Sequence, residues 1–445
     1  MADGGGGAGD LLSALPDDVL HLILLRLRSA AAAARTSVLA RRWRSLWTTL
    51  PELRFPAVTD LARVTAALLS HDAPLLHRLE LCSHDPAPHE VAAVLHLAAR
   101  SLAGKLLLDI VMRKKRNPVA AAAAGIGAAF HIPCFRKATE ISIRFAYLTI
   151  RLPPFGVFAK LSVLRLTRFR LDDSQCDHLG DIVSSERLVK SAIRSKTLLT
   201  VGLFELEELQ QLTISAPMLR TLHLVHCLDK RAVRAADISA AALEKLGWIG
   251  LCDWNSVHFN VIQHLKRLDT LNLSSMVDCE FLMEDMNTLP AIEILSLRSI
   301  TAGHAFGPCV FQLLRTSTGV RELHLDLDHH LKGEVSCSSG CICYKPSDWE
   351  SMDICLNFLQ KVEINNLSGA EYEICFVKRL LTWAPVLKMI TVMFGPSVTV
   401  SEEVCQELLS FSRRCSPGIC MEIYLHGNRA KVMYRAVNLK RPRDD

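Results

Sequence analysis

Apolar and polar positions follow two different periods along this chain. Between Leu15 and Leu27, apolar residues recur at helical spacing after a Leu-Pro start, and two aspartates stand in the first turn, where the helix dipole favours negative charge. From Leu76 onward the pattern becomes apolar-x-x-apolar-x-apolar, and its period of two is typical of short buried strands. The sequence therefore predicts a small helical module followed by a strand-rich body.

The helical module carries more apolar surface than two short helices can bury in each other. At about 100° per residue, the first helix has one broad apolar arc and two leucines opposite it: Val19, Leu20, Ile23, Leu24 and Leu27 in the arc, Leu22 and Leu25 opposite. The second segment, RTSVLARRWRSLW, is predicted to place five apolar residues on one face: Val38, Leu39, Trp43, Leu46 and Trp47. A unit below about 40–60 residues rarely builds an adequate core alone. The surplus face therefore binds a helical partner or docks on the rest of the chain, and periodicity leaves both open.

The body repeats its apolar triplet at a nearly constant interval. Triplets begin at Leu76, Leu161, Leu219, Leu243, Leu268, Ile292 and Val320, and those from Leu219 to Ile292 are 24 or 25 residues apart. Intervals of about 20–29 residues are typical of leucine-rich repeats. We therefore predict a curved solenoid in which each repeat adds one strand to a parallel sheet.

Alternation along each predicted strand indicates which side chains face away from the core. The predicted concave face consists of Val163, Arg165, Gln211, Thr213, Thr221, His223, Lys245, Thr270, Asn272, Ser296, Arg298, Glu322, His324 and Asp326. Both charge signs occur together with hydroxyl and amide groups, whereas a nucleic-acid groove would be mainly basic with interleaved aromatics. This face suits a polypeptide partner, and the alternative is an ordinary solvated sheet face.

Composition and charge narrow the function classes. The 445 residues are 50% hydrophobic and 22% charged, which is a folded composition, and a net charge of +5 gives no strong attraction to nucleic acid or anionic membrane. The start, MADGGGGAGD, has neither the basic residues nor the apolar core of a secretory signal. We expect an intracellular protein of the nucleus or cytoplasm, neither secreted nor bound to a membrane, with its 15 cysteines mostly as buried thiols.

Two short motifs have alternative explanations. Cys337, Cys341 and Cys343 lie in the segment SCSSGCICYKPSDW, but no second cysteine pair completes a zinc set, so a packed structural loop is favoured over a zinc or redox site. We therefore expect no metal and no cofactor. The basic clusters RKKR at 113–116 and LKRPRDD at the C-terminus are nuclear targeting signals, phosphate-contact clusters or solvated loops.

The N-terminal motif resembles a known module. The stretch LPDDVLHLILLRL, followed by RTSVLARRWRSLWTTLPELRF, resembles the F-box, although SAAAAA at 29–34 departs from the usual proline-containing link. The resemblance implies binding to the Skp-type adaptor of cullin-based ubiquitin ligases. The adaptor contacts implied by it are Leu15, Pro16, Leu20, Ile23 and Leu27.

The C-terminal part resembles the FBD domain that follows leucine-rich repeats in plant F-box proteins. This resemblance rests on LQKVEINNLSGAEYEICFVKRLLTWAPVLKMITVMF at 359–394, which is also predicted to form strand, helix and strand and to cap a solenoid end. The predicted organisation is a disordered segment (1–10), F-box (11–55), leucine-rich-repeat solenoid (56–335), cysteine loop (336–350), FBD domain (351–430) and charged tail (431–445).

Together these features predict an α/β substrate receptor without catalytic residues. The F-box would dock the adaptor, and through it a cullin, while the concave face holds a target protein for ubiquitination. The residues assigned to target binding are Arg165, His223, Arg298, Glu322 and His324. No phosphate-binding loop, nucleophile elbow or metalloprotease motif occurs in the sequence. The alternative function is an interaction scaffold that forms no active ligase.

Overall fold

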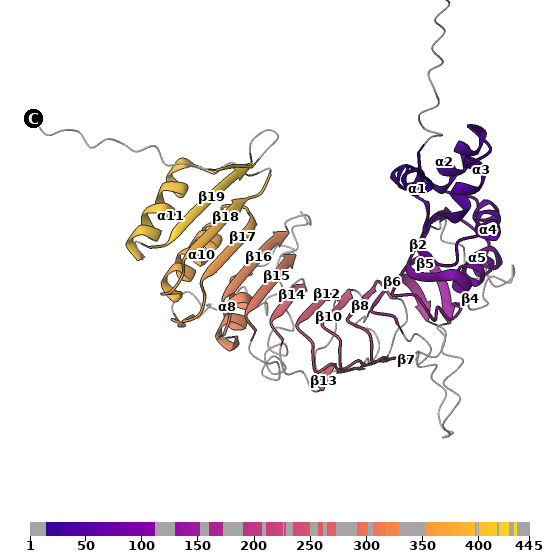
Figure 1. Ribbon diagram of the computed structural model, residues 1–445. Coiled ribbons are helices and arrows are strands. Elements are labelled where there is room, and N and C mark those ends of the chain that lie inside the picture. The colour runs from indigo at the N-terminus through magenta and orange to yellow at the C-terminus, as the bar shows by residue number, and fades with distance from the viewer. Residues whose placement is uncertain are drawn as a thin grey trace, which may run out of the picture. The chain divides into compact units, whose positions relative to one another are not determined.

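A computed structural model describes most of the chain. The described residues are 15–111, 130–151, 160–171, 190–206, 211–225, 227, 235–249, 257–260, 265–272, 292–300, 306–317, 319–328, 352–396, 398, 400–415, 418–426 and 431–433. The chain divides into two compact units, residues 1–219 and residues 220–445, and each is described by itself. The predicted helical module and strand-rich α/β body are both present (Figure 1).

Unit 1 begins with the helical module. Its elements are α1 (Asp17–Arg26), α2 (Ala30–Arg35), η1 (Thr36–Val38), α3 (Trp43–Leu46) and η2 (Trp47–Thr49). Pro16 occupies the N-cap of α1, and the Ser29 hydroxyl accepts a hydrogen bond from the backbone N–H of Ala32 at 3.3 Å, which caps α2. The alanine-rich link is therefore a short helix with a regular N-terminal cap.

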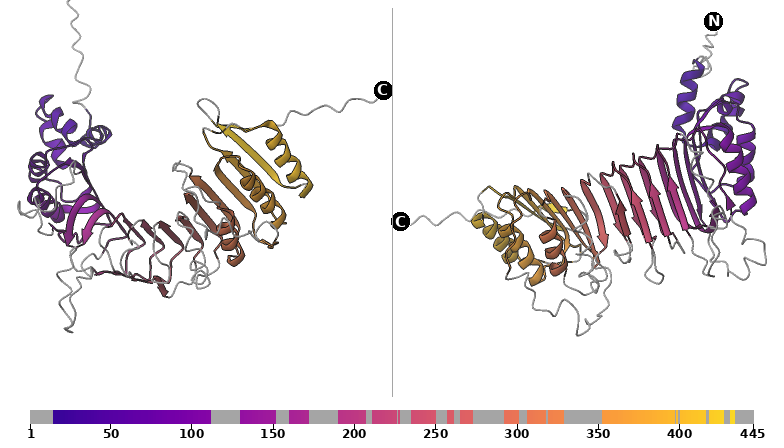
Figure 2. Two further views of the ribbon diagram at one scale, coloured as in Figure 1. Left: turned by 180° about the vertical axis from the view of Figure 1, so that it is seen from behind. Right: turned by 90° about the horizontal axis from the view of Figure 1, so that it is seen from below.

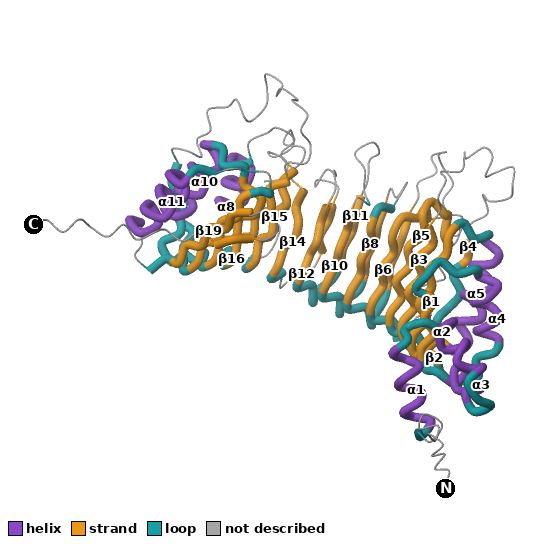
Figure 3. The backbone as a smooth tube through the Cα atoms, turned by 90° about the horizontal axis from the view of Figure 1, so that it is seen from above, coloured by secondary structure: helices purple, strands orange, loops and turns teal. Residues whose placement is uncertain are grey.

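The strands of unit 1 form a parallel sheet in the order β1-β2-β3-β5-β6-β8. The elements are β1 (Glu52–Phe55), α4 (Leu61–Leu69), β2 (Leu76–His84), α5 (Pro88–Ser101), β3 (Leu102–Val111), β4 (Phe130–His131), β5 (Glu140–Arg151), β6 (Val163–Leu171) and β8 (Thr200–Phe204). Helices α4 and α5 pack on each other beside β1–β3 (Figure 3). A separate parallel pair joins β7 (Lys190–Arg194) to β9 (Gln211–Ser215).

In unit 2 the main sheet consists of strands β10, β12 and β14 to β20. The elements are β10 (Thr221–Val225), β11 (Ala235–Ser239), β12 (Lys245–Ile249), β13 (Val257–Asn260), β14 (Arg267–Asn272), β15 (Ile294–Ile300), α8 (Gly307–Thr316), β16 (Glu322–Asp328), β17 (Lys361–Leu367), α10 (Glu371–Trp383), β18 (Met389–Phe394), α11 (Glu402–Cys415), β19 (Cys420–His426) and β20 (Lys431–Met433). Strands β10 to β19 of the main sheet are parallel, β20 is antiparallel to β19, and β11 pairs with β13. Helices α8, α10 and α11 lie on one face of β15–β19, as the yellow and orange ribbons of Figure 2 also show.

Each repeat buries one residue before its strand and two within it. In unit 2 the second residue of each strand from β10 to β18 of the main sheet belongs to an uninterrupted apolar row that is fully buried: Leu222, Leu246, Leu268, Leu295, Leu323, Val362 and Ile390. Backbone bonds repeat at the strand starts, since the N–H groups of Glu293 and Ile294 both bond the Lys266 carbonyl oxygen and the next repeat does the same one strand along. Burial of these side chains, at about 25 cal/mol per Å² of apolar area, is the main stabilising term.

Two register predictions in the body were wrong. In β14 the repeat begins at Leu265, not Leu268, because Leu268 pairs with Leu295 and a bulge between Asp269 and Leu271 absorbs one residue. Gln211 and Thr213 belong to β9, which pairs with β7 and not with the main sheet, so they are not on its face. Strand β8 with its preceding buried Leu198 is a repeat that the apolar pattern did not reveal.

The strand–helix–strand prediction for 359–394 is confirmed. Strands β17 and β18 flank α10, whose Phe376 and Leu380 are fully buried. The turn into α10 is held by Glu373, which is buried and accepts hydrogen bonds from the N–H groups of Ser368 (2.7 Å) and Gly369 (2.9 Å). Gly369 has a φ of +81°, a conformation that glycine adopts without a steric penalty.

Candidate protein-interaction surfaces

The helical module has its own core and a second apolar surface outside it. Leu20 and Leu24 of α1 pack with Trp43, Leu46 and Leu50 in that core. Five large apolar residues of the module remain exposed, and we call them the exposed apolar set: Val19 (38%), Leu22 (61%), Leu27 (44%), Val38 (87%) and Leu39 (63%). The described part of the chain does not cover them, so the surplus apolar surface is available to a partner.

The five predicted adaptor contacts differ in how far their side chains are exposed to solvent. Pro16 and Leu27 are exposed, and Leu15 and Ile23 are half-buried against the module's core. Leu20 is fully buried, so its prediction as a partner-facing side chain was wrong. The helical period places Leu20 in the same apolar arc of α1 as Val19 and Ile23. The module's core, however, packs against the part of that arc formed by Leu20 and Leu24.

The second segment of the module also differs from the prediction. Trp43 and Leu46 are buried as expected, but Val38 and Leu39 point to solvent. The single helix that the period assumed is broken into α2, η1, α3 and η2, so the angular positions of residues 38 and 39 do not carry over to α3. The segment is tied back to α1 by the ion pair between Arg42 and Asp17.

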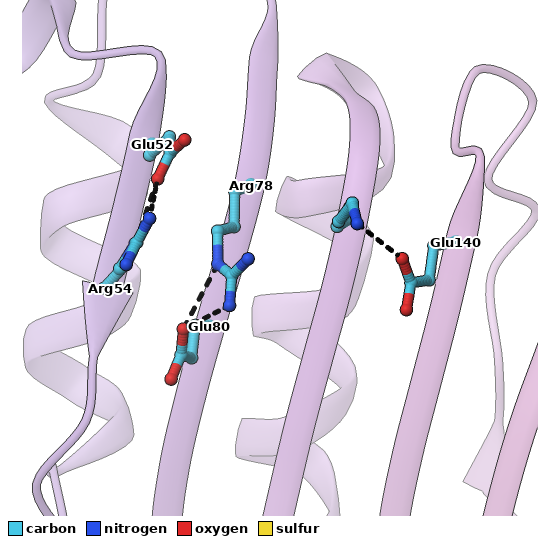
Figure 4. Close-up of polar contacts among 6 residues, drawn as sticks. Glu52, Arg54, Arg78, Glu80 and Glu140 are labelled. Atoms are coloured by element: carbon cyan, nitrogen blue, oxygen red, sulfur yellow. Dashed lines mark hydrogen bonds and ion pairs between the residues drawn. The ribbon is translucent and has the colours of Figure 1, made fainter.

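On the sheet of unit 1, the face opposite the core carries charged residues that neutralise each other. Arg54 pairs with Glu52, and Arg78 pairs with Glu80 at 2.9 Å along the same strand (Figure 4). Glu140 joins three strands, because its carboxylate contacts Lys105 of β3 at 2.9 Å and Arg165 of β6 at 2.8 Å. Arg165, a predicted target contact, is therefore exposed but already ion-paired.

The Glu140 carboxyl is tuned by these neighbours. Burial by itself raises the pKa of Glu140, but hydrogen bonds and charge from Lys105 and Arg165 outweigh burial and leave the pKa below its ordinary value. A lowered folded-state pKa means that the charged form stabilises the fold. This stabilisation is complete above the unfolded-state pKa and is lost as the pH falls through the folded-state pKa.

Glu140→Gln should therefore lower the free energy of unfolding in a pH-dependent way. Solvent screens the half-exposed Lys105 and Arg165, so we expect a loss of about 0.5–1 kcal/mol at pH 7. Urea titrations at neutral and strongly acidic pH measure it, and the two proteins should converge in acid. An equal loss at both pH values would contradict the ionic origin.

On the sheet of unit 2, the predicted target contacts lie on the face opposite the core. Arg298 is exposed and lies 3.5 Å from Asp326 on the next strand. His324 lies between two carboxylates, 3.4 Å from Glu322 and 3.3 Å from Glu363. The four side chains and Glu363 thus come from three neighbouring strands.

His223 occupies a special position on the same unit. Gly247 on the adjacent strand has no room for a side chain, because a Cβ there would lie 2.2 Å from Nδ1 of His223. The imidazole therefore lies over the glycine backbone. A glycine within a predicted strand, here Gly247, is the sequence feature that indicates such a close approach by a neighbouring side chain.

The cysteine loop at 336–350 and the RKKR cluster lie outside the described residues, as does the tail from residue 434. In the described parts of the chain no group of three or more His, Cys, Asp or Glu side chains could hold a metal ion. Nor does any helix there have the length and apolar character needed to cross a bilayer.

Comparison with known proteins adds to this geometry. Residues 12–55 match the F-box domain family. A putative F-box/FBD/LRR-repeat protein of Arabidopsis thaliana is 40% identical over 82 residues, which are 17% of this chain and 19% of the relative. Another F-box/FBD/LRR-repeat protein from the same plant is 30% identical over 219 residues, covering 46% of this chain and 47% of the relative. A third, also named as a putative F-box/FBD/LRR-repeat protein, is 25% identical over 355 residues, 73% of this chain and 67% of the relative.

The chain therefore contains an F-box domain joined to a strand-rich α/β region. The predicted resemblance to the plant F-box/leucine-rich-repeat/FBD family is confirmed by these relatives. The matches to the first two relatives, at 19% and 18% of their length, span about a fifth of each.

Proposed function

We propose that this protein is the substrate-receptor subunit of a Skp–cullin–F-box ubiquitin ligase. The observation that carries the proposal is the F-box match at 12–55 together with large apolar side chains left exposed in that module. A module with its own core and a second apolar surface is suited to bind a partner. The F-box family supplies the identity of that partner, a Skp-type adaptor, which links the receptor to a cullin.

The adaptor surface in this proposal combines the predicted residues with those that the structure adds. Leu15, Pro16, Ile23 and Leu27 remain in it, and Leu20 is left out. The other members of the exposed apolar set join it: Val19, Leu22, Val38 and Leu39. Burial of each leucine at an interface is worth about 1.5–3 kcal/mol. Several such residues are enough for a stable complex once the cost of association is met.

We further propose that residues 56–335 form a curved leucine-rich-repeat solenoid and that the FBD domain, 351–430, caps it. In-register parallel strands and continuous buried rows within each unit support this arrangement. Its polar sheet face would bind the target protein. Arg165, His223, Arg298, Glu322 and His324 stay the candidate contacts.

The mechanism in this proposal is proximity, and the chain supplies no catalytic group. A target held on the sheet face is brought near the ubiquitin-conjugating enzyme carried by the cullin, which raises the effective concentration of its lysines. The receptor needs neither metal nor cofactor for this role. It would act inside the cell, in the nucleus or the cytoplasm.

The test is target capture in cells with the proteasome blocked. Charge reversal at Arg298 and Glu322 should reduce the captured target several-fold without reducing the co-purified adaptor, because both residues lie on the sheet face of unit 2 and not in the F-box. The matched control reverses one positive and one negative exposed charge elsewhere, at Arg63 of α4 and Glu403 of α11. Equal losses from the control would exclude the sheet face as the target site.

A further inference from the structure

Two carboxylates near the C-terminal end of unit 2 stand on either side of one threonine. The strand register pairs Glu363 of β17 with Thr391 of β18, and Thr391 with Glu422 of β19. Adjacent strands are about 4.8 Å apart, so the two carboxylate-bearing residues are about 10 Å apart across the sheet. All three residues are half-buried, and Thr391 alternates along β18 with the buried Ile390 and Val392, so the three lie on the opposite face of the sheet from those buried side chains.

Neither carboxylate forms an ion pair with a lysine or arginine whose side chain the structure describes. The ionic neighbour of Glu363 is the imidazole of His324, which is positive only when protonated. Glu422 accepts a hydrogen bond from the Tyr424 hydroxyl at 3.1 Å. Lys361, on the same face, is 3.8 Å from Glu322 and is thus partly committed to that carboxylate.

On the polar face of the unit 1 sheet, by comparison, the carboxylates are neutralised by basic side chains. There Glu52, Glu80, Asp109 and Glu140 each have an arginine or lysine nitrogen within 3.6 Å. The surplus negative charge beside Thr391 is therefore a local feature and not a general property of the repeats.

The pKa of the Tyr424 phenol reflects the charge of the neighbouring Glu422. The hydrogen bond to Glu422 raises the pKa of Tyr424, and burial and the negative charge of Glu422 raise it further. Deprotonation is disfavoured where negative charge has already accumulated.

Apolar side chains complete the surface. Met389 and Met393 lie two positions before and after Thr391 on β18, on the same side of the strand, and Met389 is 37% exposed. Methionine is flexible and polarizable and adapts to differently shaped apolar partners. The methionines therefore make the surface apolar along β18, and the glutamates on the two neighbouring strands make it negative on either side of β18. We call Glu363, Met389, Thr391, Met393, Glu422 and Tyr424 the Thr391 surface.

We infer that the Thr391 surface binds an extended segment of the target protein in which two basic residues lie four positions apart with an apolar residue midway between them. Side chains of an extended chain alternate in direction, so positions i, i+2 and i+4 face the same side. Four residues span about 13 Å, and two long, flexible lysine side chains can turn inward to reach carboxylate-bearing residues about 10 Å apart. The apolar side chain then contacts the methionines. This inference rests on the proposed function, because it states the chemistry of the target that the sheet face takes.

The experiment uses the purified full chain and two fluorescent octapeptides, Gly-Lys-Thr-Leu-Thr-Lys-Ser-Gly and its counterpart with glutamate in place of both lysines. Anisotropy at low salt should show about tenfold preference for the lysine peptide. The variant E363K/E422K should reverse the preference. The milder E363Q/E422Q should abolish it, which keeps the test valid if the reversed variant does not fold.

The matched control is E371K/E403K, which makes the same charge change on exposed residues of α10 and α11. It should keep the lysine preference. An intact chain that binds both peptides equally or neither, or a control that loses the preference, would overturn the inference. So would binding that appears only after K440E/R441E/R443E, since the occupant would then be the chain's own basic tail.

No adaptor takes part in this measurement. Its failure therefore leaves adaptor binding and target degradation untouched, whereas failure of the proposed function would show in those two properties and not in peptide preference.

Discussion

A chain carrying Leu22→Lys and Leu39→Lys should fold normally and no longer co-purify a Skp-type adaptor. Both leucines are more than 60% exposed, and surface substitutions of this kind usually change the free energy of unfolding by less than about 0.5 kcal/mol. At an interface the same lysines would be buried without a partner, and the cost of burying an unpaired charge exceeds the gain from the remaining contacts. We expect at least about a hundredfold loss of adaptor affinity.

Leu20→Lys should give the opposite combination. Its side chain is fully buried with Leu24 and Trp43, so a charge there should unfold the module before any partner is involved. Even Leu20→Ala should cost about 2–5 kcal/mol. Thermal unfolding and adaptor co-purification, measured on the same preparations, separate the two cases.

The matched control is Leu69→Lys, at a leucine of α4 that is 67% exposed but lies outside the F-box. It should keep both the fold and the adaptor. Normal adaptor binding by the Leu22/Leu39 variant would show that the exposed apolar set is not the docking surface.

Trp383→Ala should be among the most destabilising single changes in unit 2. Trp383 is 1% exposed and packs against Phe311 of α8 and Phe376 of α10, with ring centroids 5.3 Å and 6.0 Å away. It therefore holds two helices together. Removal of a buried tryptophan side chain costs about 3–5 kcal/mol, and edge-to-face aromatic pairs contribute beyond their buried area.

Trp383→Phe should recover most of that loss. The indole nitrogen is buried and has no hydrogen-bond acceptor among the described residues, so phenylalanine loses no hydrogen bond there. Phenylalanine also keeps an aromatic ring for the Arg379 guanidinium, which lies 5.4 Å from the ring centroid of Trp383. Denaturant midpoints of the two variants and the intact chain measure the difference. If Trp383→Phe were as destabilising as Trp383→Ala, the indole N–H would have a structural role that this packing does not explain.

Local patterns were sufficient to predict the elements of residues 359–394. Alternation around Val362, Ile364, Ile390 and Val392 and the helical spacing from Phe376 to Leu380 each agree with the strands and helix observed. Each of these elements is buried on one side only, so the apolar period in the sequence identifies the buried face directly.

In the F-box, the division of apolar side chains between core and surface could not be predicted without the tertiary structure. Apolar residues occur nearly all round α1, and a period shows which of them share a side but not which side the core takes. Leu20 and Leu22 could therefore not be assigned to core and surface from sequence. The placement of Val38 and Leu39 depended on a helix break that no proline or glycine marks.

The sheet faces show a further limit. In β14, apolar residues at 265, 268, 271 and 273 satisfy two registers, and the choice depends on backbone bonds to neighbouring strands. The pairing of Glu140 with Lys105 and Arg165 joins residues far apart in sequence, so it follows from register and not from any local motif.

The central claim is that the F-box couples a protein held on the sheet face to ubiquitin-dependent degradation. The most direct measurement is the half-life of a captured target in cells that express either the intact chain or the Leu22→Lys/Leu39→Lys variant. The account predicts that the variant still captures the target, has lost the adaptor, and leaves the target several-fold longer-lived. A target captured equally by both chains, with an unchanged half-life although the adaptor is lost, would contradict the account and identify the protein as an interaction scaffold.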